Sequence, residues 1–320
     1  MRALQVSGPR RIGLADLPRP EPSAGQVLVR LEALSICGTD MMLYRHPQPE
    51  ESYPLTLGTP CHECAGTIVE SRAPGWVEGQ RVIYLPVLNL NGGAEYVVGG
   101  PSDLVALPDE GDLGEWLMCQ PWGTVLFSLE RAGPVIGKRV AVLGQGCIGL
   151  LFTMTLRRMG AAQIITTDLI DHRLEVSRRL GADLAINAAT DDAVQAVHEA
   201  TNGQGADLVV EACGEQAALA QAVQMARMYG TLALFGIPEE QQVTFDYFAA
   251  LCKQLTMIGS VSATCEAPAR PIRAAVGLQG QGWPGLSWLI THRLPFDEAS
   301  ESYEMYADRS DDVLKAVLEL

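Results

Sequence analysis

The chain has 320 residues, of which 48% are hydrophobic, and its 23 Lys and Arg against 38 Asp and Glu give a formal net charge of −15. The length predicts one or two domains with sizeable cores, and the acidic balance argues against binding to nucleic acid or to an anionic membrane surface. The first residues, MRALQVSGPRRIGL, lack the apolar stretch of a signal peptide, and the apolar run Val140–Leu156 contains three glycines, so we expect neither a leader nor a membrane span. Eight cysteines in such a chain favour free thiols or metal ligands in a reducing, cytoplasmic compartment.

Residues 1–110 are rich in Val, Leu, Gly and Pro and carry short alternating runs separated by Gly/Pro turns, which predicts a compact β-rich domain. Glu115–Ala132 is interrupted only by Pro121 and Gly123 and predicts a helix that bridges two domains. The strands predicted before it are Val27–Ala33, Gly66–Glu70, Arg81–Tyr84 and Ala94–Val98.

From Lys138 the pattern alternates between strand and helix, which predicts a doubly wound sheet of parallel strands. Residues 265–320 return to mixed character and are expected to rejoin the first domain. The fold class is therefore α/β, with a β-rich domain at 1–121 and 265–320 and an inserted sheet domain at 122–264. The predicted strands of the sheet are 139–143, 163–167, 184–187, 207–211, 231–235 and 256–261, with helices between them such as Cys147–Met159, Arg173–Leu180 and Gln216–Met228.

A glycine-rich turn follows the first strand of this second domain. Gly144, Gly146 and Gly149 fit the pattern G-x-G-x-x-G. The first glycine permits a tight turn, the second lets the backbone approach a pyrophosphate, and the third lets helix pack on strand. The following helix points its N-terminal N–H groups at the anion, so a pyrophosphate is expected over Cys147 and Ile148. The order of strand, glycines and helix favours a dinucleotide site over a cofactor-free turn.

Asp168 ends the next predicted strand, 19 residues after Gly149, where a carboxylate can hold a ribose 2′-hydroxyl. Its charge would repel a 2′-phosphate, so NAD is expected rather than NADP. Arg173 lies nearby and could weaken the preference for NAD, although an ordinary solvated helix residue explains it equally well.

Two segments of the β-rich domain contain residue types that bind metal. Cys37-Gly38-Thr39-Asp40 follows the first predicted strand, and Cys61-His62-Glu63-Cys64 precedes the second. Thiolate, imidazole and carboxylate are ligands of catalytic zinc, and Asp40 could accept a hydrogen bond from the other ring nitrogen of His62. Taken singly, such a cysteine is more often a buried apolar residue. The Cys-x-x-Cys spacing is also formally a redox motif, but it leads into a strand and lacks the helix N-terminus that activates a thiol.

These motifs resemble the zinc-dependent medium-chain dehydrogenase/reductase family (alcohol, sorbitol and threonine dehydrogenase-like) over nearly the whole chain. The resemblance implies a GroES-like catalytic domain with an inserted Rossmann domain, and zinc-assisted hydride exchange between NAD and a secondary alcohol, polyol or carbonyl compound. It also favours a homodimer or homotetramer, as does the unpaired edge strand expected at Leu255–Val261. The segments that carry it are Cys37–Asp40, His62-Glu63, Ala94–Tyr96, Gly144–Gly149, Asp168 with Arg173, Val210–Gly214 and Leu234–Gly236.

The same resemblance assigns roles to individual residues. It implies that Cys37 and His62 are zinc ligands and that the hydroxyl of Thr39 passes the alcohol proton outward. Gly236 lies near the carboxyl end of a predicted strand, where ligands bind in such sheets, and we expect it to belong to the cofactor site together with Cys213.

The third zinc-ligand position departs from the family pattern. Members of the family carry Cys, Asp or Glu before a proline at the start of the bridging helix, where this chain has Gln120. Because a neutral Gln is a poor zinc ligand, Glu63 could complete a Cys–His–Glu site, with Gln120 holding a zinc-bound water as in sorbitol dehydrogenase-like members. Alternatively Cys119 or Cys61 could stand in, and with neither repair the site would hold no zinc.

Two further departures concern the surroundings of the site. Tyr84–Gly93 contains no cysteine, so the structural-zinc lobe of the family is absent and no second zinc is expected. Met42 stands where the family often has a relay histidine. Besides the zinc-assisted dehydrogenase, two functions stay open: a zinc-free quinone or enoyl reductase-like enzyme, which Gln120 favours, and a cofactor-binding protein that has lost its activity.

Overall fold

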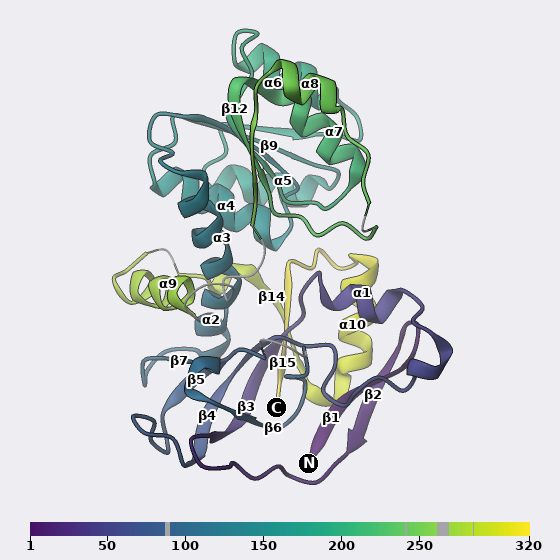
Figure 1. The fold of residues 1–320 in the computed structure, drawn as a ribbon, viewed down its shortest axis with the longest axis vertical. Coiled ribbons are helices and arrows are strands. Elements are labelled where there is room, and N and C mark those ends of the chain that lie inside the picture. Colours follow the sequence, from purple (N-terminus) through teal and green to yellow (C-terminus); the bar gives the residue numbers. More distant parts are fainter. Residues whose placement is uncertain (87–89, 241, 261–268, 284) are drawn as a thin grey trace. The chain divides into compact units, whose positions relative to one another are not determined.

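A computed structural model describes residues 1–86, 90–240, 242–260, 269–283 and 285–320 (Figure 1). The chain divides into two compact units: the first comprises Met1–Gly123 and Ala263–Leu320, and the second comprises Thr124–Ser262. None of the helices in the described ranges is long and apolar enough to cross a membrane.

The first unit is built on a mostly antiparallel sheet with the strand order β14-β15-β3-β4-β5-β7, and β6 also pairs with β3. The C-terminal strand pairs antiparallel with β3, so that Val317 lies opposite Ser35. The last residues of the chain therefore enter the sheet that carries the N-terminal cysteine and histidine segments. The strands are β3 (Val27–Ser35), β4 (Glu63–Ser71), β5 (Arg81–Tyr84), β6 (Tyr96–Gly99), β7 (Leu104–Ala106), β14 (Ile290–Pro295) and β15 (Lys315–Glu319).

A separate hairpin of β1 (Arg2–Gly8) and β2 (Arg11–Asp16) precedes this sheet. The sequence does not predict it, because Arg10 in the turn adopts a φ of +53°, a conformation usually signalled by Gly or Asn. The other elements of the unit are the helices α1 (Asp40–Arg45), α2 (Leu113–Leu117), α9 (Arg270–Gly280) and α10 (Ala299–Asp308), the first residues of α3 (Cys119–Ala132), and the short 3₁₀ turns Glu50–Ser52, Pro101–Asp103, Ser287–Leu289 and Phe296–Glu298.

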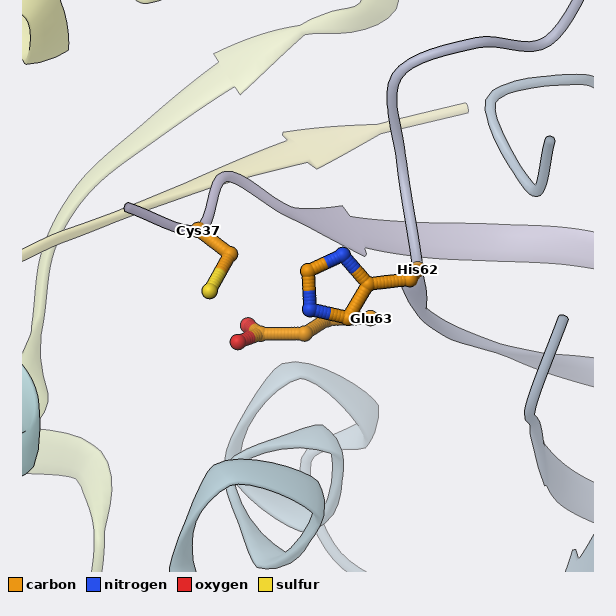
Figure 2. A group of neighbouring side chains, drawn as sticks. All are labelled: Cys37, His62 and Glu63. Atoms are coloured by element: carbon orange, nitrogen blue, oxygen red, sulfur yellow. The ribbon is translucent and has the colours of Figure 1, made fainter. Parts of the chain in front are cut away.

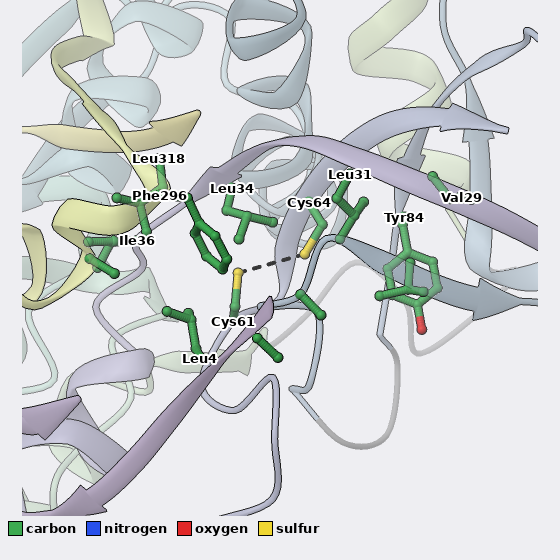
Figure 3. Packing of buried hydrophobic residues seen from close by; sticks show 14 of the residues in the cluster. Leu4, Val29, Leu31, Leu34, Ile36, Cys61, Cys64, Tyr84, Phe296 and Leu318 are labelled. Atoms are coloured by element: carbon green, nitrogen blue, oxygen red, sulfur yellow. Dashed lines mark hydrogen bonds between the residues drawn. The ribbon is translucent and has the colours of Figure 1, made fainter. Parts of the chain in front are cut away.

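The hydrophobic core of the first unit combines residues of this sheet, of the β1–β2 hairpin and of α10 (Figure 3). Each large apolar side chain that is fully buried contributes about 1.5–3 kcal/mol to folding. Residues from distant parts of the chain meet here, because Leu4, Leu34, Phe296 and Leu318 belong to one cluster. Two thiols of the Cys-x-x-Cys motif belong to the same cluster, which places them in a hydrocarbon environment.

The second unit is a sheet with the order β10-β9-β8-β11-β12-β13, and every strand pair in it is parallel. This is the strand order of a doubly wound Rossmann sheet, so the predicted fold class is confirmed. Helices α4 and α5 pack against each other, as do α6, α7 and α8. The elements are β8 (Arg139–Leu143), α4 (Cys147–Arg158), β9 (Gln163–Asp168), α5 (Asp171–Leu180), β10 (Leu184–Asn187), α6 (Ala193–Ala200), β11 (Ala206–Glu211), α7 (Gln216–Met225), β12 (Ala226–Leu234), α8 (Tyr247–Cys252) and β13 (Thr256–Gly259).

Several predicted element boundaries are wrong. The helix predicted at Gln216–Met228 ends at Met225, because Ala226 already pairs with Ala206 in the sheet. The single helix predicted at Glu115–Ala132 is two helices, and the second begins at Cys119, so that Pro121 falls in its first turn, where a missing N–H is tolerated.

Two predicted strands also have different ends. The strand predicted at Ala94–Val98 begins at Tyr96, and β13 ends at Gly259. Residue 261 of the strand predicted at 256–261 lies outside the described residues.

Candidate active site

Three side chains of the first unit bring a sulfur, an imidazole nitrogen and a carboxylate oxygen together. The ligand atoms of Cys37, His62 and Glu63 all lie within 4.8 Å of one another, and the side chains converge in Figure 2. The sheet register explains the approach: Ser35 at the end of β3 lies opposite Glu63, the first residue of β4. Cys37 follows Ser35 by two residues, and His62 directly precedes Glu63. The side chains of Cys37 and His62 therefore start from the same end of this strand pair.

These donors fit a zinc ion. A tetrahedral zinc with ligand bonds of about 2.0–2.3 Å separates its ligand atoms by about 3.2–3.8 Å, so small side-chain rotations would complete the site. Thiolate, imidazole and carboxylate are all zinc ligands, and three of them leave one coordination position for water or substrate. The residues predicted as metal ligands are thus brought together.

The carboxylate of Asp40 interacts with both the ring of His62 and the backbone of Cys37. This carboxylate is fully buried at the first position of α1, and its Oδ1 lies 3.1 Å from His62 Nδ1. Its Oδ2 accepts a hydrogen bond of 2.8 Å from the backbone N–H of Cys37. The ring of His62 therefore presents Nε2 to the cluster, with Thr39 Oγ1 3.4 Å from that nitrogen.

The charges of this cluster act on His62. Burial by itself lowers the pKa of His62, but its interactions with Cys37 and Asp40 outweigh burial and raise the pKa well above its usual 6.5. A group with this pKa binds either a proton or a metal ion, and the two compete for the same nitrogen.

Glu63 has a buried cationic partner that the sequence reasoning missed. Lys315 Nζ lies 2.5 Å from Glu63 Oε2, and the side chains of both residues are 1% exposed. The same ammonium group donates to the carbonyl of Ile36, at 3.0 Å. The sequence signal for this pairing is a single Lys among the apolar residues 313–318. It is the first residue of β15.

The alternative ligands have different surroundings. Burial raises the pKa of Cys119 to about 12, which keeps it a neutral thiol. The thiol of Cys61 contacts Cys64 Sγ at 3.7 Å (Figure 3), and this hydrogen bond together with burial raises its pKa well above the usual value. A reactive dithiol needs a lowered thiol pKa, so this environment also disfavours a redox function for the Cys-x-x-Cys motif. Gln120 lies in the first turn of α3 with 8% exposure, and its water-holding role stays a prediction.

The glycine turn of the second unit has the expected local geometry. Gly144 follows β8 with a φ of +87°, a value that favours glycine. Gly146 precedes the first residue of α4, Cys147, so the backbone N–H groups of Cys147 and Ile148 lie in the first turn of that helix. A Cβ on Gly149 would collide with the carbonyl oxygen of Gly144, so the helix can approach the turn this closely only with glycine.

Asp168 contacts this turn, and Arg173 lies beside it. Asp168 is the last residue of β9, and its Oδ2 accepts a hydrogen bond of 2.6 Å from the backbone N–H of Gln145. Nη1 of Arg173 would lie 3.7 Å from a Cβ on Gly146, so its guanidinium group lies beside the turn. A carboxylate and a cation therefore flank the glycines, where a dinucleotide would place ribose and phosphate.

Cys213 and Gly236 lie at the carboxyl end of the neighbouring strands. The buried Glu211, another residue that sequence reasoning did not assign to the site, accepts hydrogen bonds from the N–H groups of Cys213 and Gly214 at 2.7 and 2.9 Å. A Cβ on Gly236 would collide with the backbone of Gly214. Cys213 Sγ in turn lies beside Gly144. Cys213, Gly214 and Gly236 thus pack closely together next to the glycine turn.

Comparison with known proteins covers both units. The family model described as alcohol dehydrogenase GroES-like domain matches residues 23–127, and the one described as zinc-binding dehydrogenase matches residues 147–275. An alcohol dehydrogenase from Cupriavidus necator is 31% identical over a 366-residue alignment covering 99% of this chain and 98% of that protein. A sorbitol dehydrogenase from Gallus gallus is 28% identical, covering 91% of this chain and 89% of its own length. The structure of an alcohol dehydrogenase from Thermus sp. ATN1 is similar with a TM-score of 0.86 at 26% identity, covering 100% of this chain and 99% of that one.

Proposed function

This chain belongs to the zinc-type alcohol dehydrogenases of the medium-chain dehydrogenase/reductase family, an oxidoreductase family, and from that premise we propose that it exchanges hydride between NAD and a secondary alcohol or polyol. The convergence of Cys37, His62 and Glu63 is the observation that carries the proposal. It supports a single catalytic zinc held by these three residues, with Gln120 contacting it through water.

A zinc ion bound there would supply Lewis acidity to the substrate oxygen. Asp40 hydrogen-bonds Nδ1 of His62 and so directs Nε2 toward the metal, and a buried carboxylate in this role strengthens the imidazole as a ligand. Lys315 holds one oxygen of Glu63 and leaves the other for the metal. The hydroxyl of Thr39, 3.4 Å from His62 Nε2, is close enough to accept the alcohol proton and pass one outward.

NAD would supply the hydride acceptor in the second unit. Asp168 supports NAD over NADP, because its carboxylate next to the glycine turn would repel a 2′-phosphate. Arg173 beside Gly146 would contribute a positive charge to the pyrophosphate. The packed residues Cys213 and Gly236 would border the same cofactor.

The proposal is tested by metal analysis together with turnover. Protein expressed with zinc should carry about one zinc per chain and should reduce NAD with members of a secondary alcohol and polyol panel. Cys37→Ser should lose both zinc and turnover, whereas Cys252→Ser, which alters an exposed cysteine of α8, should keep both. Protein without zinc that reduces enones or quinones would support the zinc-free reductase instead. NADH binding without turnover of any alcohol or aldehyde would support an inactive cofactor-binding protein.

We also propose that the protein is a homodimer formed along β13. This strand is at the edge of the sheet, and the neighbouring helix α8 exposes Tyr247, Phe248 and Leu251 by 67%, 73% and 56%. From Tyr247 to Ser260 the one charged side chain is Lys253, and its ammonium group donates to three backbone carbonyls. A two-fold contact places the same patch on both sides of the interface, so a patch without free charge suits a second copy of a chain with a net charge of −15.

Light scattering after size exclusion tests the dimer. Phe248→Glu should halve the molar mass, because it places charge on both sides of the contact. Ile136→Glu, which alters another exposed apolar residue of the same unit outside this patch, should keep the wild-type mass. A wild-type monomer, or a mass that Phe248→Glu leaves unchanged, would contradict an interface at α8 and β13.

A further inference from the structure

We propose that Tyr303 of α10 is a positioning residue that fixes His62 for metal binding, an inference that rests on the proposed zinc site. Its phenol is 1% exposed, and its hydroxyl donates a hydrogen bond of 2.5 Å to the carbonyl oxygen of Pro60. The two residues are 243 positions apart in the sequence. Pro60 lies two residues before His62.

The carbonyl of Pro60 depends on this contact. Proline has no N–H, so the carbonyl is the single hydrogen-bonding group that the backbone of Pro60 offers. A buried carbonyl needs a partner, because an unpaired one loses its hydrogen bonds to water and gains none in the protein. The hydroxyl of Tyr303 supplies that partner from the C-terminal part of the chain.

The backbone of the next residue, Cys61, forms hydrogen bonds with a different segment. The N–H of Cys61 donates to the carbonyl of Leu90 at 2.7 Å, and the N–H of Gly92 donates to the carbonyl of Cys61 at 2.9 Å. Pro60 and Cys61 are therefore held by two separate parts of the unit, α10 and the segment at residues 90–92. His62 follows directly and starts from this fixed backbone.

Tyr303 also packs on the helix that orients the imidazole. Its ring contacts Tyr44 of α1, with 5.4 Å between the ring centroids and 58° between their planes. Asp40, which contacts His62 Nδ1, is the first residue of the same helix. One side chain thus touches both the backbone leading to His62 and the helix carrying its hydrogen-bond acceptor.

The hydroxyl is the part of Tyr303 that packing does not explain. Tyr303 belongs to the apolar cluster of the first unit, where a phenyl ring would fill the same space. Tyr44 belongs to the same cluster, but its hydroxyl donates to Glu304 Oε2 at 2.7 Å, away from the Pro60–His62 segment. The two tyrosines therefore form a matched pair in which a single hydroxyl reaches the metal-ligand segment.

The experiment compares Tyr303→Phe with Tyr44→Phe. The first readout is the NMR signal of the His62 ring in metal-free protein, and the second is the zinc dissociation constant from competition with a chelator. Tyr303→Phe should shift or broaden the His62 ring signals and weaken zinc binding by roughly 10- to 100-fold, as removal of a group supporting a metal ligand does. Tyr44→Phe should leave both close to wild type, and circular dichroism should show that both variants are folded.

The outcomes separate this inference from the proposed function. Unchanged His62 signals in Tyr303→Phe would overturn the inference, and so would equal effects in the two variants, because those indicate general packing. If the wild type binds no zinc while Tyr303→Phe alone disturbs His62, the proposed zinc function fails and the positioning role of Tyr303 stands.

Discussion

Lys315 and Glu63 form an ion pair that is sealed from solvent, with Nζ and Oε2 2.5 Å apart and both side chains 1% exposed. The pair joins the C-terminal strand to the first residue of β4, 252 positions earlier in the chain. A buried charge is stable only when it is paired and hydrogen-bonded, so each of these residues needs the other. The same carboxylate lies close to the ligand atoms of Cys37 and His62.

Replacing Lys315 by Met should therefore destabilise the metal-free protein strongly. Removing one partner of a buried pair costs about 3–5 kcal/mol, because it leaves the other charge uncompensated. Urea unfolding followed by tryptophan fluorescence measures this loss. Glu63→Gln combined with Lys315→Met should recover much of it, since neither charge then remains. A loss in Lys315→Met no larger than that in Lys138→Met, which alters a partly exposed lysine of the second unit, would mean that the pair does not have this role.

The titration of His62 gives the metal-free protein a specific pH dependence. The pKa of His62 is raised in the folded state by Cys37 and Asp40, above the value of about 6.5 expected when unfolded. The folded state therefore binds this proton more tightly, and the resulting stabilisation is complete below about pH 6.5 and is lost as pH rises through the folded pKa.

The measurement is the free energy of unfolding in the presence of a chelator, for wild type and His62→Asn, at a series of pH values. The advantage of the wild type should shrink as pH increases. An advantage that grows with pH would show that the imidazole is neutral in the folded protein. Zinc affinity should change in the opposite direction and rise with pH, because the metal displaces the proton.

The sequence predicts the parts of this protein that depend on short stretches. The parallel, doubly wound sheet of the second unit follows from alternating strands and helices, and Cys37, His62 and Asp40 are identified by motifs within a few residues. Lys315 and Tyr303 are not predictable in this way, because strand pairing and helix packing bring them to the site from the far end of the chain. The early end of α7 at Met225 has a similar cause, since pairing of Ala226 with Ala206 overrides a helical pattern that continues to Met228.

Cofactor preference should depend on the charge of Asp168. Asp168→Asn keeps an acceptor for the N–H of Gln145 but removes the charge that would repel a 2′-phosphate. The ratio of kcat/KM for NAD to that for NADP should fall by about tenfold, which corresponds to about 1.4 kcal/mol. Asp171→Asn, which alters the first residue of α5, should leave the ratio nearly unchanged. Equal ratios for Asp168→Asn and wild type would exclude Asp168 as the residue that selects NAD.

Two glycine-to-alanine substitutions should have opposite effects on stability. Gly236 packs against the backbone of Gly214 and against Glu211, so an added methyl group would push the two loops apart. Gly236→Ala should lower the free energy of unfolding by about 1–3 kcal/mol, the usual penalty of overpacking. It should also weaken NADH binding, because the same loops would border the cofactor in the proposed site. Gly277 lies in α9 with no atom near the position of its missing Cβ. Gly277→Ala should raise stability by about 0.5–1 kcal/mol, since alanine restricts the unfolded chain and favours helix, and should leave NADH binding unchanged. Urea unfolding and NADH fluorescence titration of the two variants measure these effects, and a Gly236→Ala protein as stable as Gly277→Ala would contradict the close packing of these loops.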